Sequence, residues 1–244
     1  MARRFIVTKE NIKKINEITY KIFGTEVKHI QVLRHNIGDT IIINEYVCKI
    51  ENMKRDSITL NVLGLASKVG EPDTNLTLYI ALLKGDKMDF VIQKAVELGC
   101  KKIVPFISRN VVVKLDEKAK EKKEEKFQKI ADEACKQCGR TDNVTVSNII
   151  SFNEVLKTQK EYDVSLFAYE NENMSIHEVF NNIRTRNLDK ISCIIGCEGG
   201  FDKLEAEELK KIENVMCISL GSRILRAETA AISLLSIITY ELEI

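Results

Sequence analysis

Long apolar segments are missing from this sequence, in which no run approaches the roughly 20 residues that a helix needs to cross a bilayer. The first five residues lead into a lysine-containing segment and lack the apolar core of a secretory signal. With 44% hydrophobic residues, the 244-residue chain can bury one large core or two small ones. We therefore expect a soluble, globular, cytoplasmic protein.

A disulfide framework is also missing. The seven cysteines are an odd number, scattered and mostly set in apolar runs, which is typical of reduced thiols that pack as small hydrophobes. Cys135 and Cys138 have the spacing of a zinc-binding pair, but no second pair follows at finger spacing. Both lie on the apolar face of an expected helix, so we expect packing and no metal site.

Glycine-rich phosphate-binding motifs and a strong net charge are absent as well. Neither Gly-x-x-x-x-Gly-Lys-[Ser/Thr] nor Gly-x-Gly-x-x-Gly occurs, which removes the main support for an ATP or dinucleotide site. The formal net charge is only +1, but residues 1–72 carry 12 Lys and Arg against 8 Asp and Glu, while residues 73–244 carry 25 against 28. The basic excess of the first part fits either a phosphate-binding surface or an ordinary solvated face.

The first seventy residues alternate short β-favouring runs with turn signals. Strands are expected at residues 4–7, 40–46, 47–51 and 57–63. With one helix expected at residues 26–35, this spacing predicts a small sheet or barrel. The segment 68–74 is typical of a linker, because Pro72 cannot continue a strand ladder. We place a domain boundary there, between residues 1–72 and 73–244.

From residue 75 onward, strands alternate with helices. Strands are expected at residues 76–83, 102–107, 164–169, 191–195 and 215–220. Helices are expected at residues 87–98, 117–138, 202–212 and 228–241. The last two strands are almost continuously apolar, which predicts burial on both faces of a parallel sheet. The pattern indicates βαβ units and an α/β fold.

Two short loops near the C-terminus, residues 195–201 and 220–229, each follow an expected buried strand and precede an expected helix. Open α/β sheets bind ligands at this position, at the carboxyl ends of their strands. Gly196, Gly199 and Gly200 allow a close approach of the backbone to a ligand, or they only make tight turns. The two loops together predict a ligand site.

Five short motifs follow one another along the chain, and their order and spacing match those of a known protein family. They are residues 84–90, residues 93–99, residues 138–140, residues 195–201 and residues 220–229. In these motifs the chain resembles the RsmE-type 16S ribosomal RNA uridine-N3 methyltransferases of the SPOUT superfamily. Residues 3–5, His29 with residues 32–34, and residues 38–39 resemble the N-terminal RNA-binding module of that family. The resemblance covers almost the whole chain, and the five motifs together are highly specific.

The resemblance implies a SPOUT-type parallel-sheet domain with a C-terminal trefoil knot, preceded by a small PUA-like β-barrel domain. It also implies S-adenosylmethionine as the methyl donor, a homodimer with its sites at the subunit interface, and methylation of a specific uridine in the decoding region of 16S rRNA in the small ribosomal subunit. Two alternatives stay open. The chain could be a SPOUT methyltransferase that acts on another RNA target, such as a ribose hydroxyl, or a non-catalytic RNA-binding factor for ribosome assembly.

The same resemblance places the cofactor in the two loops. Ile195, Leu220, Ile224 and Leu225 would line an adenine slot in which main-chain groups contact the edge of the base. The expected cofactor-binding residues are Ile195, Gly196, Glu198, Gly199, Gly200, Leu220, Gly221, Ile224, Leu225, Arg226, Glu228 and Thr229. Cys197 stands where the family usually has proline, so we expect a less rigid loop that still binds the cofactor, with altered affinity.

Methylation of uridine N3 requires the removal of its proton and the stabilisation of the resulting negative charge. Glu198 and Glu228 are the acidic candidates, and Arg223 and Arg226 are the cationic ones. We expect the arginines to stabilise the anion, and the predicted catalytic set is Arg226, Arg223 and Glu198. Two purely structural roles remain as alternatives to catalysis: Glu228 compensates the dipole of a helix, and Arg226 pairs with Glu228.

The expected RNA contacts are basic side chains that would bind phosphate and recognise RNA shape. They are Arg3, Arg4, His29, Arg34 and Arg140. Arg140 follows Gly139 at a helix end, so it is expected to be exposed and either to bind phosphate or to form a structural ion pair. His29 could equally be a surface histidine without a role.

Overall fold

The computed structural model describes residues 3–66, 71–113, 115–170, 172, 174–183 and 188–243. The chain forms two compact units, one from segments 1–70 and 136–141 and the other from segments 71–135 and 142–244. Part of the linker predicted at residues 68–74 lies outside the described residues. Among the described residues, no helix combines the length and the apolar character that a membrane span requires.

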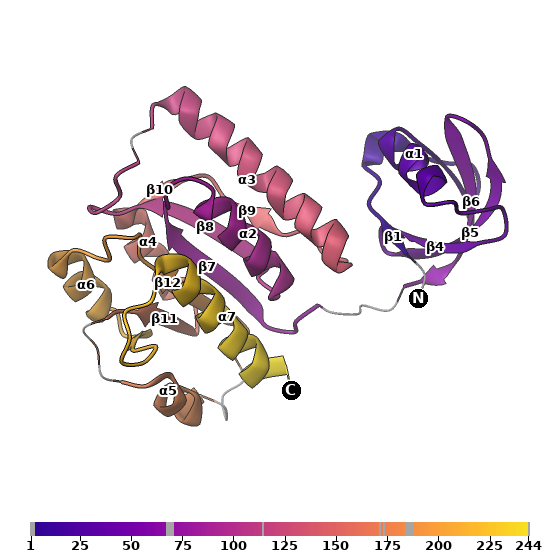
Figure 1. Cartoon of the computed structure of the whole chain (residues 1–244). Coiled ribbons are helices and arrows are strands. Elements are labelled where there is room, and N and C mark those ends of the chain that lie inside the picture. Colours follow the sequence, from indigo (N-terminus) through magenta and orange to yellow (C-terminus); the bar gives the residue numbers. More distant parts are fainter. Residues whose placement is uncertain are drawn as a thin grey trace. The chain divides into compact units, whose positions relative to one another are not determined.

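The N-terminal unit is built on one six-stranded sheet (Figure 1). In spatial order its strands are β1 (Arg4–Phe5), β4 (Thr40–Ile43), β5 (Tyr46–Met53), β6 (Ser57–Leu65), β3 (Thr19–Phe23) and β2 (Ile12–Lys14). β1 and β4 are parallel, and the other neighbours are antiparallel. Helix α1 (Thr25–Val32) buries Val27 and Ile30 in the core of this unit, and a 3-10 turn, η1, spans Lys9–Asn11.

All four strands predicted in this unit are present, although the first ends at Phe5. β2 and β3 were not predicted: β2 has a single apolar residue among three, whereas β3 contains Tyr20, Ile22 and Phe23 and its β-favouring composition could have been recognised. The helix predicted at residues 26–35 ends at Val32. Arg34 has φ +59°, in the left-handed region, so the right-handed helix cannot continue through it.

The C-terminal unit holds a seven-stranded sheet. Its strands, in spatial order, are β10 (Ile150–Ser151), β8 (Lys102–Ile107), β7 (Asn75–Ala81), β12 (Lys190–Ile195), β11 (Val164–Ala168) and β13 (Val215–Ile218), and β9 (Thr145–Val146) pairs with β8 off this path. All of these pairings are parallel, which confirms the predicted α/β fold with a parallel sheet. The central strands β7 and β12 are buried along most of their length.

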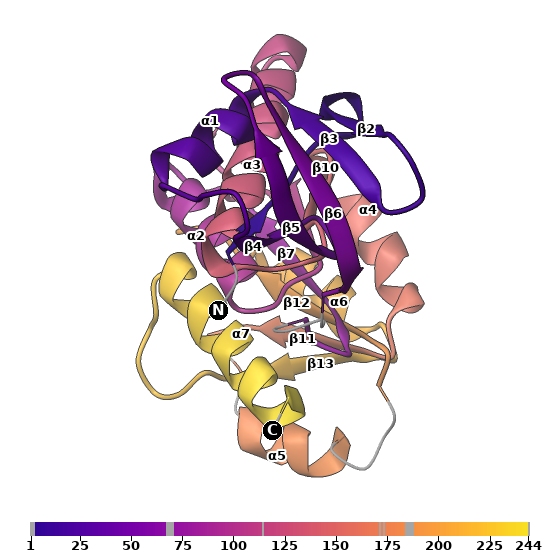
Figure 2. The same cartoon turned by 90° about the vertical axis from the view of Figure 1, so that its right-hand side faces the viewer.

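Helices α2 (Lys87–Glu97) and α7 (Ala227–Glu243) lie side by side on one face of this sheet (Figures 1 and 2). The remaining helices are α3 (Glu117–Cys138), α4 (Phe152–Thr158), α5 (Ile176–Ile183) and α6 (Lys203–Lys210), and the 3-10 turn η2 spans Gln159–Glu161. The capping box expected at the start of α6 is present, with Asp202 as the N-cap and Glu205 as its partner. α4 and α5, with seven and eight residues, and β9 and β10, with two residues each, were not predicted.

Candidate functional site

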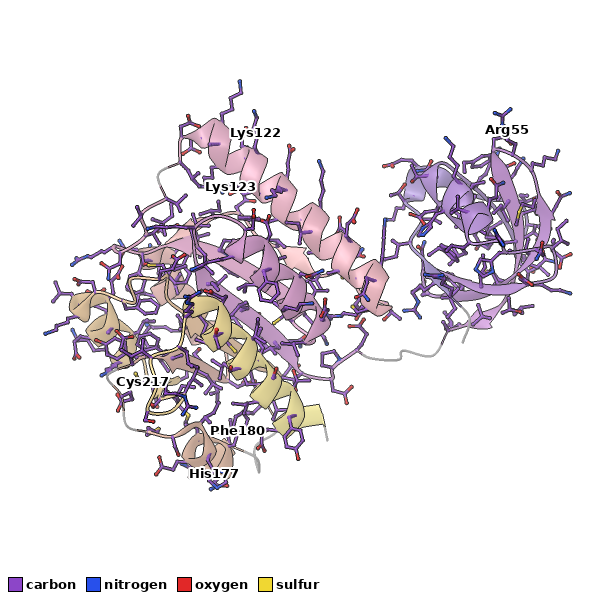
Figure 3. All side chains as sticks on the ribbon, viewed as in Figure 1. Arg55, Lys122, Lys123, His177, Phe180 and Cys217 are labelled. Atoms are coloured by element: carbon purple, nitrogen blue, oxygen red, sulfur yellow. The ribbon has the colours of Figure 1, made fainter. Side chains whose placement is uncertain are left out.

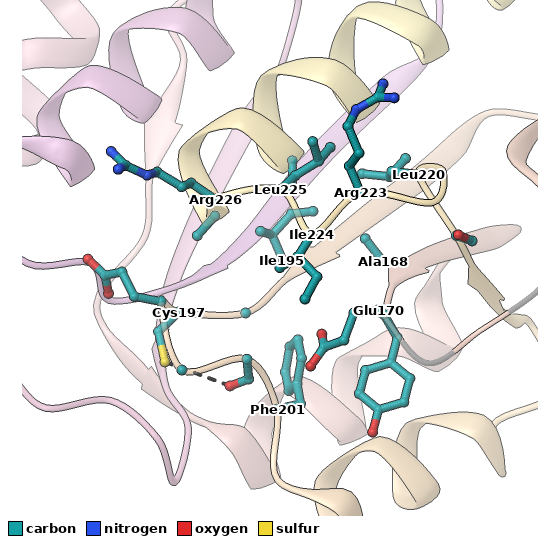
Figure 4. A pocket seen from close by; sticks show the side chains of 18 of the residues that line it. Ala168, Glu170, Ile195, Cys197, Phe201, Leu220, Arg223, Ile224, Leu225 and Arg226 are labelled. Atoms are coloured by element: carbon teal, nitrogen blue, oxygen red, sulfur yellow. Dashed lines mark hydrogen bonds between the residues drawn. The ribbon is translucent and has the colours of Figure 1, made fainter.

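A cavity of about 720 Å³ opens at the carboxyl ends of β11, β12 and β13. One wall is residues 195–201, hereafter the glycine loop, and the other is residues 219–227, hereafter the arginine loop (Figure 4). Ala168, Tyr169 and Glu170, at the end of β11, complete the lining. Because parallel strands end at the same sheet edge, loops that are distant in sequence meet here.

The glycine loop is a tight turn with a close internal contact. The N–H of Gly200 donates to the carbonyl of Cys197 at 3.0 Å, and the Cys197 thiol donates to the carbonyl of Gly200 at 3.7 Å (Figure 4). A Cβ at Gly196 would lie 2.9 Å from Cε2 of Phe201, so a larger residue there would force the ring or the loop to shift. The Cys197 thiol thus supplies a hydrogen bond across the turn, at the position where the family usually has proline.

Neighbouring segments brace the glycine loop from outside. The side-chain amide of Asn110 donates to the carbonyl of Gly199 at 2.9 Å. The Glu198 carboxylate accepts from the backbone N–H of Lys84 at 3.1 Å, and its Oε1 lies 3.3 Å from Nζ of Lys87. Three contacts from two other parts of the chain therefore fix this wall of the cavity.

Glu198 is held in its ionised form. Burial alone would raise the pKa of its carboxyl, but hydrogen bonds from its own backbone N–H and that of Lys84, with the ammonium of Lys87, outweigh burial and keep the pKa below its ordinary value. A carboxylate with a lowered pKa is a weak general base. The geometry therefore gives Glu198 a role in holding the loop.

Lys87 also approaches the N-terminal turn of α7. Its Nζ lies 3.7 Å from Oε2 of Glu228, beyond hydrogen-bond distance, and within the described part of the chain this buried oxygen has no hydrogen-bond partner. Among the described residues, the pairing of Arg226 with Glu228 that the sequence left open does not occur, and the cation beside Glu228 is Lys87. Glu228 does lie in the first turn of α7, where a carboxylate compensates the helix dipole.

The arginine loop is exposed. Arg223 and Arg226 form no ion pair with any described residue, and Figure 4 shows their guanidinium groups pointing away from each other. The expected role of these two arginines in stabilising an anion therefore stays a prediction. Ile224 lines the cavity but is 89% exposed, so this residue lies at an open rim and does not close a slot.

Ten of the twelve residues predicted to bind the cofactor line the cavity, and Glu228 and Thr229 do not. On α7 only Ala227 and Ala230 face the cavity, because helical periodicity directs the two residues between them elsewhere. Sequence analysis missed Lys87 and the end of β11 as parts of the lining. The strand at residues 164–169 was predicted, so its carboxyl end could have been placed at the same sheet edge.

The predicted RNA contacts of the N-terminal unit have different surroundings. Arg3 and Arg34 are exposed, whereas Arg4 is half-buried in β1. Nδ1 of His29 lies 3.3 Å from Oε2 of Glu26, in the preceding turn of α1. These positions leave their roles in RNA binding as predictions.

Two expectations about the end of α3 are wrong. Arg140 is buried, with 4% of its surface exposed, and it lies in segment 136–141, which belongs to the same compact unit as segment 1–70. Cys138 is exposed while Cys135 is buried, because the last residue of α3 no longer faces the core. Among the described residues, no group of three or more His, Cys, Asp and Glu side chains could hold a metal ion.

Known proteins share this architecture. A family model described as an RNA methyltransferase domain matches residues 70–239. The chain is 35% identical to ribosomal RNA small subunit methyltransferase E of Bacillus subtilis (strain 168), over 100% of this chain and 98% of that protein. It is 32% identical to the protein of the same name from Mesomycoplasma hyopneumoniae (strain 232), over 86% of this chain and 89% of that protein. The crystal structure of a ribosomal RNA small subunit methyltransferase E from Neisseria gonorrhoeae, bound to S-adenosyl methionine, shares the fold with a TM-score of 0.82 and 24% identity over 98% of each chain.

Proposed function

Since this chain belongs to the ribosomal RNA small subunit methyltransferase E family, we propose that it transfers a methyl group from S-adenosylmethionine to N3 of a uridine in small-subunit 16S rRNA. The observation that carries the proposal is the cavity between the glycine and arginine loops. Its volume of about 720 Å³ suits a nucleoside cofactor, because small-molecule sites span roughly 300–1,000 Å³.

The residues of the cavity fit this cofactor. Ile195, Leu220 and Leu225 offer an apolar wall for the adenine, and the backbone of the two loops offers donors and acceptors for its edge. The lining also holds both charge signs, with Glu170 and Lys87 among its residues. This combination suits the methionine moiety of the cofactor, which carries an ammonium and a carboxylate.

When bound, S-adenosylmethionine supplies an electrophilic methyl group. We assign to Arg226 the stabilisation of the negative charge that spreads over the uracil carbonyl oxygens once N3 loses its proton, because this exposed guanidinium has no competing ion pair among the described residues. Arg223 points away from it and would contact another part of the RNA. Glu198 fixes the glycine loop through Lys84 and Lys87, so most of its catalytic contribution is positioning.

Further features of the family complete the proposal. We propose that residues 73–244 form the methyltransferase domain with a C-terminal trefoil knot, that residues 1–72 form a PUA-like RNA-binding domain, and that the protein acts in the cytoplasm as a homodimer. The high exposure of Ile224 on the rim of the cavity supports a second subunit there, because a covered rim would remove this apolar surface from water.

The decisive experiment supplies labelled S-adenosylmethionine and small ribosomal subunits that lack the modification, followed by nucleoside analysis of the RNA. Labelled 3-methyluridine is the expected product. Label on a ribose or another base would redirect the activity to a different RNA target. Cofactor binding without any label in the RNA would refute the proposed methyl transfer and favour a non-catalytic factor for ribosome assembly.

A further inference from the structure

We propose that a second site, a groove in the N-terminal unit, binds one nucleotide of a single-stranded segment of the substrate RNA; this inference rests on the proposed function and extends it. The groove has a volume of about 610 Å³. It is lined by Gln31 near the end of α1, by residues 35–37 that follow the helix, and by residues 53–55 at the β5–β6 turn. The basic residues that the sequence singled out for RNA lie outside this lining.

Hydrogen bonds make the groove a built feature. The side-chain amide of Gln31 donates to the carbonyl of Lys54 at 2.8 Å and ties the end of α1 to the β5–β6 turn. On the other side, Oδ2 of Asp39 accepts from the backbone N–H of Asn36 at 2.8 Å and lies 3.3 Å from Nδ1 of His35. Both sides are therefore fixed before any ligand arrives.

The charges around the groove favour an anion. Lys54 and Arg55 are exposed, neither forms an ion pair with a described residue, and Figure 3 shows Arg55 extending away from the unit. The lining contains no carboxylate. Neither flanking acid belongs to the lining or forms an ion pair with Lys54 or Arg55: Asp39 contacts residues 35 and 36, and Asp56 accepts from the hydroxyl of Ser57 at 3.3 Å. The two cations are thus available for phosphate.

Apolar and polar groups beside these cations suit a base. Ile37 is 63% exposed, and Met53 next to the cations is half-buried, so together they offer a surface for the face of an unstacked base. Nδ1 of His35 faces Asp39, which leaves Nε2 for the base edge. Sequence-specific RNA recognition mostly uses such splayed, single-stranded bases. A protein partner would need roughly 800 Å² of contact surface, whereas this groove holds about one nucleotide.

The test uses two double variants of the full-length protein. K54A/R55A removes the cations of the groove, and K9A/K13A removes the same charge from exposed positions of the same unit outside it. Binding of a fluorophore-labelled single-stranded fragment of small-subunit RNA is followed by anisotropy over a range of KCl concentrations. In K54A/R55A the slope of log K against log [KCl] should become shallower by about 1.4, which corresponds to two lost phosphate contacts, while K9A/K13A should keep the wild-type slope.

A third variant tests the base contact separately. Ile37→Ser should weaken binding severalfold at every salt concentration without a change of slope, because it removes apolar contact and no charge. Equal slopes of log K against log [KCl] in both double variants would overturn the proposed RNA site. A polyglutamate probe tests for an acidic protein ligand in its place. If K54A/R55A lost binding to this probe but kept RNA binding, the RNA site would also be overturned. Methyl transfer by the wild type is measured in parallel: RNA binding through the groove without transfer would refute only the proposed function, and transfer with wild-type RNA binding by K54A/R55A would refute only the groove.

Discussion

The two loops that wall the cavity are held in opposite ways. Asn110, Lys84 and Lys87 contact the glycine loop, and the ring of Phe201 packs edge-on at 4.9 Å from that of Phe167. In the arginine loop, the side-chain hydrogen bonds within the described chain join only residues 219 and 221. The packing of one chain therefore defines the glycine loop, the wall that we propose for the cofactor. The arginine loop has fewer such contacts and, in the same proposal, meets RNA or a second subunit.

The largest effect is expected from the exposed wall. Arg226→Ala should lower the single-turnover rate of methyl transfer by about 10²–10³-fold, the loss that follows removal of one anion-stabilising donor. Cofactor affinity, measured by equilibrium dialysis, should change far less. Arg226→Lys keeps the positive charge and should recover part of the rate. Equal losses of rate and affinity in Arg226→Ala would give this residue a structural role.

A smaller effect is expected when the braced wall is disturbed. In Gly196→Ala the new Cβ would lie 2.9 Å from Cε2 of Phe201, so the loop must shift. We expect a loss of about 1–3 kcal/mol in the free energy of unfolding, together with weaker cofactor binding. Gly64→Ala is the matched control, because a Cβ there meets nothing within 4 Å. Wild-type stability and affinity in Gly196→Ala would show that this wall is as adaptable as the other.

The smallest effect concerns the brace at Lys87. The pKa of Glu198 in the folded protein lies below its ordinary value of 4.5, so the unfolded chain binds more protons in that range. The resulting stabilisation is complete above about pH 4.5 and is lost as the pH falls through the lower folded value. Lys87→Met should reduce this acid-dependent drop in the free energy of unfolding by at most about 1 kcal/mol.

Urea unfolding at about pH 6 and about pH 3 measures this difference. Lys84→Met is the control, since Lys84 reaches Glu198 through its backbone N–H, which the substitution leaves in place. An unchanged drop in Lys87→Met would mean that backbone hydrogen bonds alone hold the glycine loop.

The sheet of the C-terminal unit could be predicted because the local sequence pattern of its longer strands indicates them. β12 is almost continuously apolar, as a strand covered on both faces must be. The start of α6 was equally visible, because Asp202 and Glu205 have the spacing of a capping box. β9 and β10 have two residues each, too few to show any periodicity, and they pair only because β8 is already in place.

The candidate site could be predicted only in outline. Its two loops follow predicted strands, and the sheet edge brings them together. Lys87 could not be recognised, because its partner Glu198 lies 111 positions further along the chain (198 minus 87) and only the fold makes them neighbours. Nor could the sequence show that Arg223 and Arg226 point apart, because side-chain direction in an open loop depends on the path of the backbone.

The pairing at the centre of the C-terminal sheet decides when a newly made chain acquires this cavity. β7 and β12 align in register from Asn75 with Lys190 to Ile80 with Ile195, so each pair is separated by 115 positions (190 minus 75). At typical synthesis rates, β12 follows β7 by roughly 6 to 23 s. Contacts between such distant segments also form slowly, because a long loop must close first. Both walls of the cavity lie at or beyond the end of β12, so a growing chain lacks the site that we propose for the methyl donor until residues 195–227 have been made.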